Sequence, residues 1–300
     1  MKNQTAPSTK LMVVLIGLFW GLNWPAVKFL LLEIPPLSLR AFSFTCAAVL
    51  LMAMSRVLGL RLRPTKGEGF ALIVTAVFLL FGFNMFTAFG QLFTQASNAA
   101  IIAYTMPAMT AVLSAFVLGD TIDKRRILAI CVGLVGLGVL AAADVPAIKA
   151  APLGPVFMLL AAFSWSIGNV LMQVHEWTLS PLVRAAWFFV ISASLTWPFV
   201  FVFEPLQELV PPSPATVWVL LFHILGPMVA CYMMWTTLLG HLSATVAAIS
   251  TLLAPVVGVL SAVILLGEPM TWQKALALFL IVASIAIAIF RKSSVLEAPD

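Results

Sequence analysis

Side chains that could bind a solute lie on aromatic and amide faces of otherwise apolar segments. Trp20 and Asn23 are three positions apart, and Trp165 and Asn169 are four apart, so each pair shares one face of a helix. An indole beside an amide can stack on an apolar ring and hydrogen-bond its polar end. The alternative is that the indoles belong to an interfacial belt and the amides hold helices together.

Two further apolar segments carry polar faces of the same kind, with Asn84 three residues before Thr87 and Tyr232 three residues before Trp235. A polar group in hydrocarbon is costly if unpaired, so these faces point toward partner helices or a wet cavity. Helix packing and cavity lining both remain open. The expected substrate-binding residues are Trp20, Asn23, Asn84, Thr87, Tyr104, Trp165, Asn169, Tyr232 and Trp235.

Signatures of enzymes and metal sites are missing from the sequence. There is no HExxH helix, phosphate-binding glycine loop or nucleophile elbow. The three cysteines lie in apolar runs without metal-ligand spacing. We therefore expect no catalytic residues, no metal and no cofactor.

Charged side chains and histidines cluster near the ends of the apolar segments, where long side chains reach the membrane surface. We expect them to be interfacial, which leaves no carboxylate for the middle of the membrane and predicts weak proton coupling. Asp120 and Glu268 each follow a glycine and are expected to cap or start the next helix. The residues assigned to segment ends are Lys28, Glu33, Arg40, Arg184, Glu204, His175, His223 and His241.

The elements that must position these residues are membrane-spanning helices. Of 300 residues, 62% are hydrophobic and 9% are charged, against about 25% charged in soluble domains. A bilayer core of about 30 Å needs about 20 apolar helical residues. Ten segments qualify: 11–31, 37–58, 70–90, 95–118, 126–143, 153–173, 182–203, 216–239, 244–266 and 273–290.

The distribution of cations predicts the orientation. With the N-terminus inside, most of the 16 Lys and Arg residues fall on the cytoplasmic side, so both termini are expected in the cytoplasm. These cations lie in short loops and tails rather than in an arginine-rich stripe, which argues against nucleic acid as a partner.

An internal repeat divides the chain. Pro107 and Gly119 recur as Pro255 and Gly267, each 148 positions later. Each copy holds five spans, an odd number, so the copies must cross the membrane in opposite senses. The predicted domains are residues 1–148 and 149–300, two inverted five-helix repeats of an all-α membrane protein with ten transmembrane helices. Pro107 and Pro255 are expected to kink the fourth and ninth helices.

The sequence Phe19-Trp20-Gly21-Leu22-Asn23 resembles the opening signature of the drug/metabolite transporter superfamily, EamA branch, and is most similar to its YddG-like exporters of aromatic amino acids. Leu118-Gly119-Asp120 and Leu266-Gly267-Glu268-Pro269 resemble the paired segments of that family. The resemblance implies ten helices around a central cavity and export by alternating access. In the second copy, Trp165-Ser166-Ile167-Gly168-Asn169 departs from the Trp-Gly pattern, which puts glycine-based close packing there in doubt.

These observations predict a secondary transporter of the bacterial inner membrane that exports small amphipathic metabolites, with aromatic or large neutral amino acids as the favoured substrates. The alternative is broad efflux of hydrophobic drugs, which could use an aromatic wall alone. A channel is less favoured because charge rings and a carbonyl-rich filter are missing. The expected partners are a small-molecule substrate and the lipid bilayer, and the oligomeric state stays open, with a monomer as one candidate.

Overall fold

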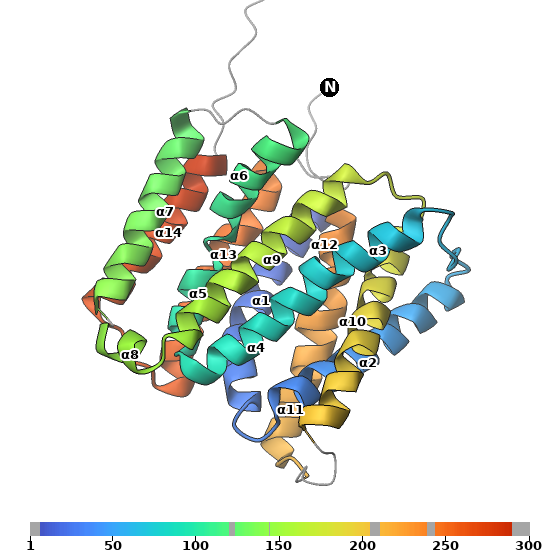
Figure 1. Ribbon diagram of the computed structural model, residues 1–300, viewed down its shortest axis with the longest axis horizontal. Coiled ribbons are helices and arrows are strands. Elements are labelled where there is room, and N and C mark those ends of the chain that lie inside the picture. The colour runs from blue at the N-terminus through green and yellow to red at the C-terminus, as the bar shows by residue number, and fades with distance from the viewer. Residues whose placement is uncertain (1–6, 120–123, 144, 205–210, 239–243, 290–300) are drawn as a thin grey trace, which may run out of the picture.

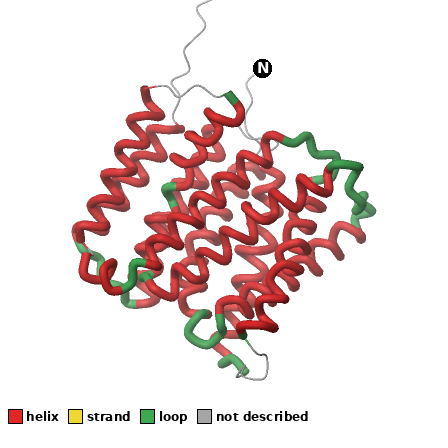
Figure 2. The backbone as a smooth tube through the Cα atoms, in the orientation of Figure 1, coloured by secondary structure: helices red, strands yellow, loops and turns green. Residues whose placement is uncertain are grey.

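A computed structural model describes residues 7–119, 124–143, 145–204, 211–238 and 244–289. In these parts of the chain the secondary structure is helical, with short connections and no strand (Figures 1 and 2). Asp120 and His241 lie outside the described residues. The all-α prediction is therefore confirmed for the described chain.

Seven helical segments are long and apolar enough to cross a membrane, and three shorter apolar stretches lie within α7, α13 and α14. Each of the ten predicted segments coincides with one of these. The uninterrupted helices are α1 (Pro7–Leu30), α2 (Pro36–Val57), α7 (Lys124–Ala143), α9 (Leu153–Val174), α10 (Pro181–Phe203), α13 (Ala244–Leu266) and α14 (Trp272–Ile289), and a short helix, α8 (Val145–Ala150), precedes α9.

Two segments contain a wide π-helical stretch. In the third, η1 (Val77–Gly82) joins α3 (Glu68–Ala76) to α4 (Phe83–Phe93). In the eighth, η3 (Ile224–Cys231) joins α11 (Pro214–His223) to α12 (Tyr232–Leu238). The π-helical turns are rare and occur often at functional sites. Both end one or two residues before a residue of the candidate site, Asn84 in one segment and Tyr232 in the other.

The fourth segment differs from the expectation of a single kinked helix. It breaks at Tyr104 and Thr105 into α5 (Ala96–Ala103) and α6 (Met106–Leu118). Pro107 lies in the first turn of α6, where its missing N–H removes no helical hydrogen bond. Pro255, by contrast, lies inside the uninterrupted α13. The two prolines therefore occupy different local structures.

Helices from the two halves of the chain pack on one another. The principal pairs are α1 with α13, α2 with α10, α4 with α9, and α7 with α14. Figure 1 shows α7 beside α14 and α4 beside α9. The core is therefore built between the halves rather than within each of them.

Glycines permit the closest of these approaches. A Cβ added at Gly21 of α1 would lie 2.5 Å from Val257 Cβ, and one at Gly168 of α9 would lie 2.5 Å from Leu79 Cα and Cβ. The doubt about glycine packing in the second half is therefore misplaced. Ser166 occupies the position in the second half that corresponds to Gly21 in the first. Gly168, two positions later, makes the close helix contact instead.

Carboxylates from one half of the chain cap the N-terminal ends of helices in the other half. Glu204 accepts hydrogen bonds from the N–H groups of Leu37 (3.0 Å) and Ser38 (2.7 Å) at the start of α2. Glu268 accepts from the N–H groups of Ala96 (2.6 Å) and Ser97 (2.9 Å) at the start of α5, and so caps a helix of the other half rather than its own neighbour. A carboxylate is favoured there because the first N–H groups of a helix lack partners and carry the positive end of the helix dipole.

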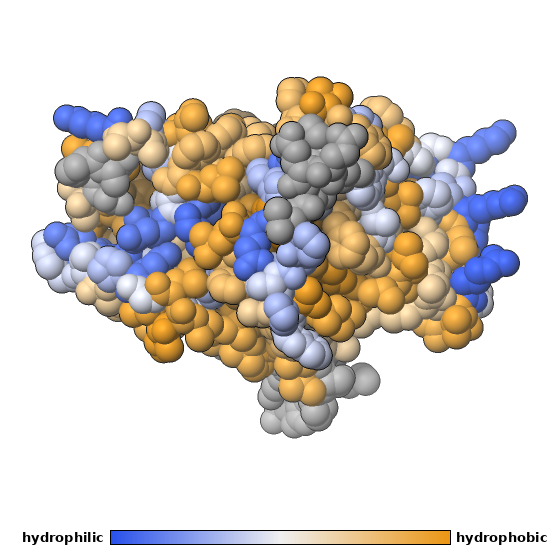
Figure 3. Space-filling view, turned by 90° about the horizontal axis from the view of Figure 1, so that it is seen from below, coloured by the Kyte–Doolittle hydropathy of each residue, from blue (hydrophilic) through white to orange (hydrophobic). Residues whose placement is uncertain are grey.

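The outer surface is apolar, as a lipid-facing surface must be. Phe70, Phe116, Trp218 and Trp272 are each at least 70% exposed. Figure 3 shows one face of the molecule with hydrophobic side chains over most of it and the hydrophilic ones gathered in separate patches. Exposed apolar surface of this extent marks contact with lipid rather than water.

Candidate functional site

Four aromatic side chains from three helices meet inside the molecule, and we call them the four-ring cluster. They are Trp20 of α1, Trp165 of α9, and Tyr232 and Trp235 of α12. The Trp20 ring lies 5.5 Å from Trp165, 5.8 Å from Tyr232 and 5.5 Å from Trp235, measured between centroids. The Trp165 ring lies 6.1 Å from Tyr232 and 6.2 Å from Trp235. These separations fall in the range of favourable aromatic pairs.

The cluster is held in place by backbone and ring contacts. The Trp20 indole N–H donates to the carbonyl of Pro227 (3.3 Å), which lies in η3. Phe83 packs against Trp165 at 4.8 Å and Phe189 packs against Tyr232 at 5.2 Å. The four rings thus pack on one another and on two neighbouring phenylalanines.

Two polar atoms beside these rings have no hydrogen-bond partner. The indole N–H of Trp235 is an unsatisfied donor, and the side-chain carbonyl of Asn169 is an unsatisfied acceptor. Both residues are buried, with 6% and 5% of their surface exposed. The Asn169 amide nitrogen donates to the Trp165 carbonyl (3.0 Å), which leaves its oxygen for another group. Buried unpaired groups are rare in folded proteins, and a ligand is one physical explanation for them.

A buried arginine organises a polar network next to the cluster. Arg40 of α2 is 1% exposed. Its Nε donates to the Asn84 carbonyl (3.0 Å), its Nη2 donates to Thr87 Oγ1 (3.3 Å), and its Nη1 lies 3.4 Å from His223 Nε2. Within the described part of the chain, no carboxylate pairs with this guanidinium. The prediction that Arg40 and His223 are interfacial is therefore wrong, because α4 and α11 supply enough polar partners to hold both inside.

The hydrogen-bond partners of His223 define its tautomer. Its Nδ1 lies 2.6 Å from Asn23 Oδ1, an oxygen that can only accept, so Nδ1 carries the proton. Nε2 is then the acceptor for Arg40. The imidazole is neutral and joins α1 to α2 through two hydrogen bonds.

The network reaches the four-ring cluster through Tyr232. Asn84 Nδ2 donates to the Tyr232 hydroxyl (3.1 Å) and to the Leu80 carbonyl (2.9 Å). Among the predicted site residues, the structure therefore joins Asn23, Asn84 and Thr87 to the rings through Arg40 and His223.

Arg184, at the equivalent place in the second half, lies near Trp177 and Thr236. Its guanidinium carbon is 5.5 Å from the Trp177 ring centroid, and Nη2 donates to the Thr236 carbonyl (3.5 Å). Arg184 is 9% exposed and its Nε has no partner. This residue too is more buried than the interfacial prediction allowed.

Tyr104, another of the expected substrate-binding residues, packs on a different ring from those of the four-ring cluster. Its ring packs edge-on against Trp24, with centroids 6.2 Å apart, and both side chains are buried. Trp24 follows Trp20 by one helical turn, so the pair lies one level away along α1.

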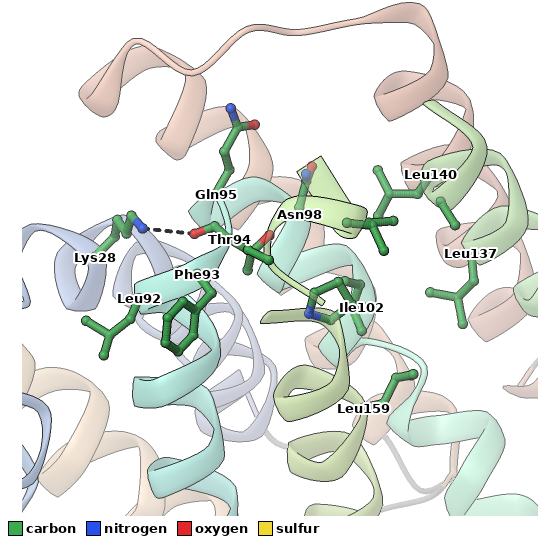
Figure 4. A pocket seen from close by; sticks show the side chains of 14 residues that line it. Lys28, Leu92, Phe93, Thr94, Gln95, Asn98, Ile102, Leu137, Leu140 and Leu159 are labelled. Atoms are coloured by element: carbon green, nitrogen blue, oxygen red, sulfur yellow. Dashed lines mark hydrogen bonds between the residues drawn. The ribbon is translucent and has the colours of Figure 1, made fainter. Parts of the chain in front are cut away.

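A cavity of about 560 Å³ lies farther along α1 and is lined in part by Lys28. The Lys28 ammonium donates to the carbonyls of Gln91 and Thr94, the second at 2.9 Å, and thereby caps the end of α4. Figure 4 shows Lys28, Thr94 and Gln95 on one side of this cavity and leucines of α7 on the other. We call it the Lys28 pocket.

Sequence reasoning missed Arg40, His223 and Lys28 as members of buried sites. Because these residues lie close to the ends of the apolar segments, they were expected at the membrane interface. Helical periodicity cannot reveal a partner on another helix. One signal was present: Arg40-Ala41 recurs as Arg184-Ala185, 144 positions later, so both halves keep an arginine at the same place.

The apolar helices and the lipid-facing surface define a multi-pass membrane protein. The chain belongs to the EamA-like transporter family, whose sequence profile matches residues 8–142 and 152–290. This family lies within the drug/metabolite transporter superfamily, as the sequence resemblance predicted.

Several relatives that match nearly the whole chain carry the names of transporters or efflux pumps. The "Uncharacterized transporter YoaV" of Bacillus subtilis is 26% identical over 93% of this chain and 95% of the relative. The "Probable amino-acid metabolite efflux pump" of Escherichia coli is 29% identical over 93% and 94%, and the protein of the same name from Salmonella typhimurium is 28% identical over 93% and 94%. A crystal structure of a protein 23% identical in sequence matches with a TM-score of 0.69 over 94% of this chain and 96% of that chain, which shows a shared fold.

Proposed function

We propose that this protein exports aromatic or other large neutral amino acids across the bacterial inner membrane, by alternating access between two inverted five-helix halves. The observation that carries the proposal is the four-ring cluster, to which both halves contribute. It combines aromatic faces with one unsatisfied donor, Trp235 Nε1, and one unsatisfied acceptor, Asn169 Oδ1.

A zwitterion with an apolar side chain matches these groups. The rings provide stacking surface for the side chain. The Trp235 N–H is a donor for a carboxylate, and the Asn169 carbonyl is an acceptor for an ammonium. Such a site holds a neutral solute without burying a protein carboxylate, which would be costly within the membrane.

The fold and the relatives support the transport mechanism. Helices of one half pack on helices of the other, so rocking of one half against the other would open the cluster to alternate sides. The family profile matches each half separately, as expected for a duplicated unit. Two relatives carry the name of an amino-acid metabolite efflux pump. The excess of cations in one set of loops supports cytoplasmic termini.

Broad efflux of hydrophobic drugs is the second candidate, and the gathering of four aromatic rings from three helices favours it. A lipophilic cation needs the aromatic wall but not the paired donor and acceptor. The two functions therefore differ in their dependence on Trp235 Nε1 and Asn169 Oδ1.

Transport by purified protein in sealed proteoliposomes tests the proposal. We expect wild-type protein to move L-phenylalanine, and Trp235→Phe and Asn169→Leu to reduce that flux about tenfold, because each removes one charge-assisted hydrogen bond. Flux of a lipophilic dye cation should change less than twofold in both variants. Trp218→Phe, at an exposed position of α11, is the matched control. Wild-type protein that moves the dye but no amino acid would favour drug efflux.

A further inference from the structure

The Lys28 pocket is amphipathic. Its polar side is formed by Lys28, Thr94 and Gln95 near the junction of α4 and α5. Its far wall is apolar and includes Leu137 and Leu140 of α7 (Figure 4). The volume of about 560 Å³ lies within the range of small-ligand sites, roughly 300–1,000 Å³.

The polar side carries an ammonium with one unused donor. The Lys28 ammonium uses two of its three donors on backbone carbonyls, and one remains for a ligand. Lys274 is not among the residues that line the pocket, and its ammonium donates to Gln95 Oε1 (2.8 Å), Ser97 Oγ (2.7 Å) and the Pro269 carbonyl (3.0 Å). The Glu268 carboxylate is bound to the N–H groups at the start of α5. The remaining donor of Lys28 therefore favours an anionic group on this side of the pocket.

The pocket is aligned with the four-ring cluster along one face of α1. Trp20, Trp24 and Lys28 follow one another at intervals of four residues, so they lie on the same side of the helix. Eight residues correspond to a rise of about 12 Å. Trp24 and Tyr104 pack together between the two levels. A solute that left the cluster along this face would pass that pair and reach Lys28.

We propose that the Lys28 pocket is a second binding site for the transported solute, in which the Lys28 ammonium binds the carboxylate of an amphipathic acid and the α7 leucines bind its apolar body. This inference rests on the proposed function, since it takes the same class of solute. The Trp24–Tyr104 pair separates the two sites and acts as the barrier between them.

Calorimetric titration of purified protein in phosphatidylcholine nanodiscs tests the site. The probes are 3-phenylpropionate, which has a carboxylate and no ammonium, and 2-phenylethylamine, which has the reverse. We expect Lys28→Gln to weaken binding of the acid to this site about tenfold, with less than a twofold change for the amine. Lys28→Arg should restore acid binding because it keeps the charge. Lys149→Gln, at an exposed position of α8 that does not line the pocket, is the matched control.

A second pair of variants changes the pocket without touching charge. Leu137→Trp should fill the apolar side and abolish the second site, whereas Leu134→Trp, on the exposed face of the same helix, should leave it intact. Equal acid binding by wild type and Lys28→Gln would overturn the site, as would an equal loss for acid and amine.

A lipid headgroup is the competing anion. If adding anionic phosphatidylglycerol to the nanodiscs displaces the acid from wild-type protein, the pocket belongs to lipid and the proposal fails. The proposed function is judged separately, by wild-type flux of L-phenylalanine. If the protein binds the acid at Lys28 yet moves no amino acid, the second binding site is supported and the proposed transport function fails.

Discussion

At the scale of single residues, the chemistry of this protein depends on polar groups held inside apolar helices. Arg40 is the extreme case, a guanidinium with 1% exposure whose partners are a carbonyl, a hydroxyl and an imidazole. Burial of the charge is expensive, and its neutral hydrogen bonds offset part of that cost. The three partners in turn need Arg40, because each would otherwise lose a donor.

Removal of Arg40 should therefore destabilise the protein. We expect Arg40→Leu and His223→Leu each to lower the free energy of unfolding by about 2–4 kcal/mol, because each leaves buried groups unpaired. The double variant should lose less than the sum, since the two share a hydrogen bond. Thermal unfolding in detergent measures this, with Arg61→Leu in an exposed loop as the control. Additive losses would mean that the two side chains are not coupled.

Gly168 tests the close approach of two helices at one residue. Gly168→Ala should destabilise the protein by about 1–3 kcal/mol, because the added methyl group would overlap Leu79, whose backbone cannot move aside locally. Gly138→Ala in α7 is the matched control, since a Cβ there meets nothing within 4 Å. The control should be neutral or slightly stabilising, because alanine favours helix. Equal behaviour of the two variants in thermal unfolding would contradict the packing argument.

At the scale of helices, the ends are fixed by carboxylates contributed from distant parts of the chain. Glu33 accepts from the backbone N–H and the hydroxyl of Ser213, each at 2.8 Å, at the start of α11. These two donors lower the pKa of the Glu33 carboxyl. Because the folded pKa is below the unfolded one, this contribution to stability is present above the unfolded pKa and is lost as pH falls through the folded pKa.

Glu204 gives the sharper test of a helix cap. We expect Glu204→Gln to lower stability by about 1 kcal/mol, because an amide is a weaker acceptor for the two N–H groups of α2 and lacks the charge that favours a helix start. Glu176→Gln, at an exposed position with no hydrogen bond to a helix start, serves as the control. Chemical unfolding of both variants in one detergent gives the comparison. An unchanged free energy of unfolding in Glu204→Gln would show that water satisfies the first N–H groups of α2 equally well.

The helices were largely predictable and their contacts were not. Apolar length alone placed a helix at each of the ten segments, and seven of these are long and apolar enough to cross a membrane. The π-helical turns and the break at Tyr104 could not be predicted, because they depend on packing against other helices rather than on the local sequence. Of the predicted site residues, Trp20, Trp165, Tyr232 and Trp235 lie together in the structure, while Tyr104 packs on Trp24, and their role in binding a substrate stays a prediction. Arg40 was missed because its partners lie on α4 and α11.

For the whole molecule, the placement of carboxylates bears on energy coupling. Glu33, Glu68, Glu204 and Glu268 each accept hydrogen bonds from N–H groups at or just before the start of a helix. None of these acids lies in the four-ring cluster. Along the described chain, the cluster and the network beside it therefore consist of neutral groups and Arg40, without a carboxylate that could exchange protons.

We accordingly expect substrate flux down its own gradient to persist when the pH gradient is collapsed. The measurement is efflux of labelled L-phenylalanine from proteoliposomes, with and without a protonophore, at one internal pH. The initial rates should agree within about twofold, because a carrier without a titrating acid at its site has no required proton step. Complete loss of downhill flux with the protonophore would contradict this expectation.

The packing of each half on the other has a consequence for biosynthesis. The helices α1, α2 and α4 are synthesised before their packing partners, which are α13, α10 and α9 respectively. The early helices therefore lie in lipid without these contacts until the later helices are inserted. α1 is without its partner for longest, since α13 begins only at Ala244, and α7 pairs last, since α14 is the last helix described. Insertion and assembly are thus separate events in time, and a chain stopped before α14 would have its other helices inserted while α7 still lacked its partner.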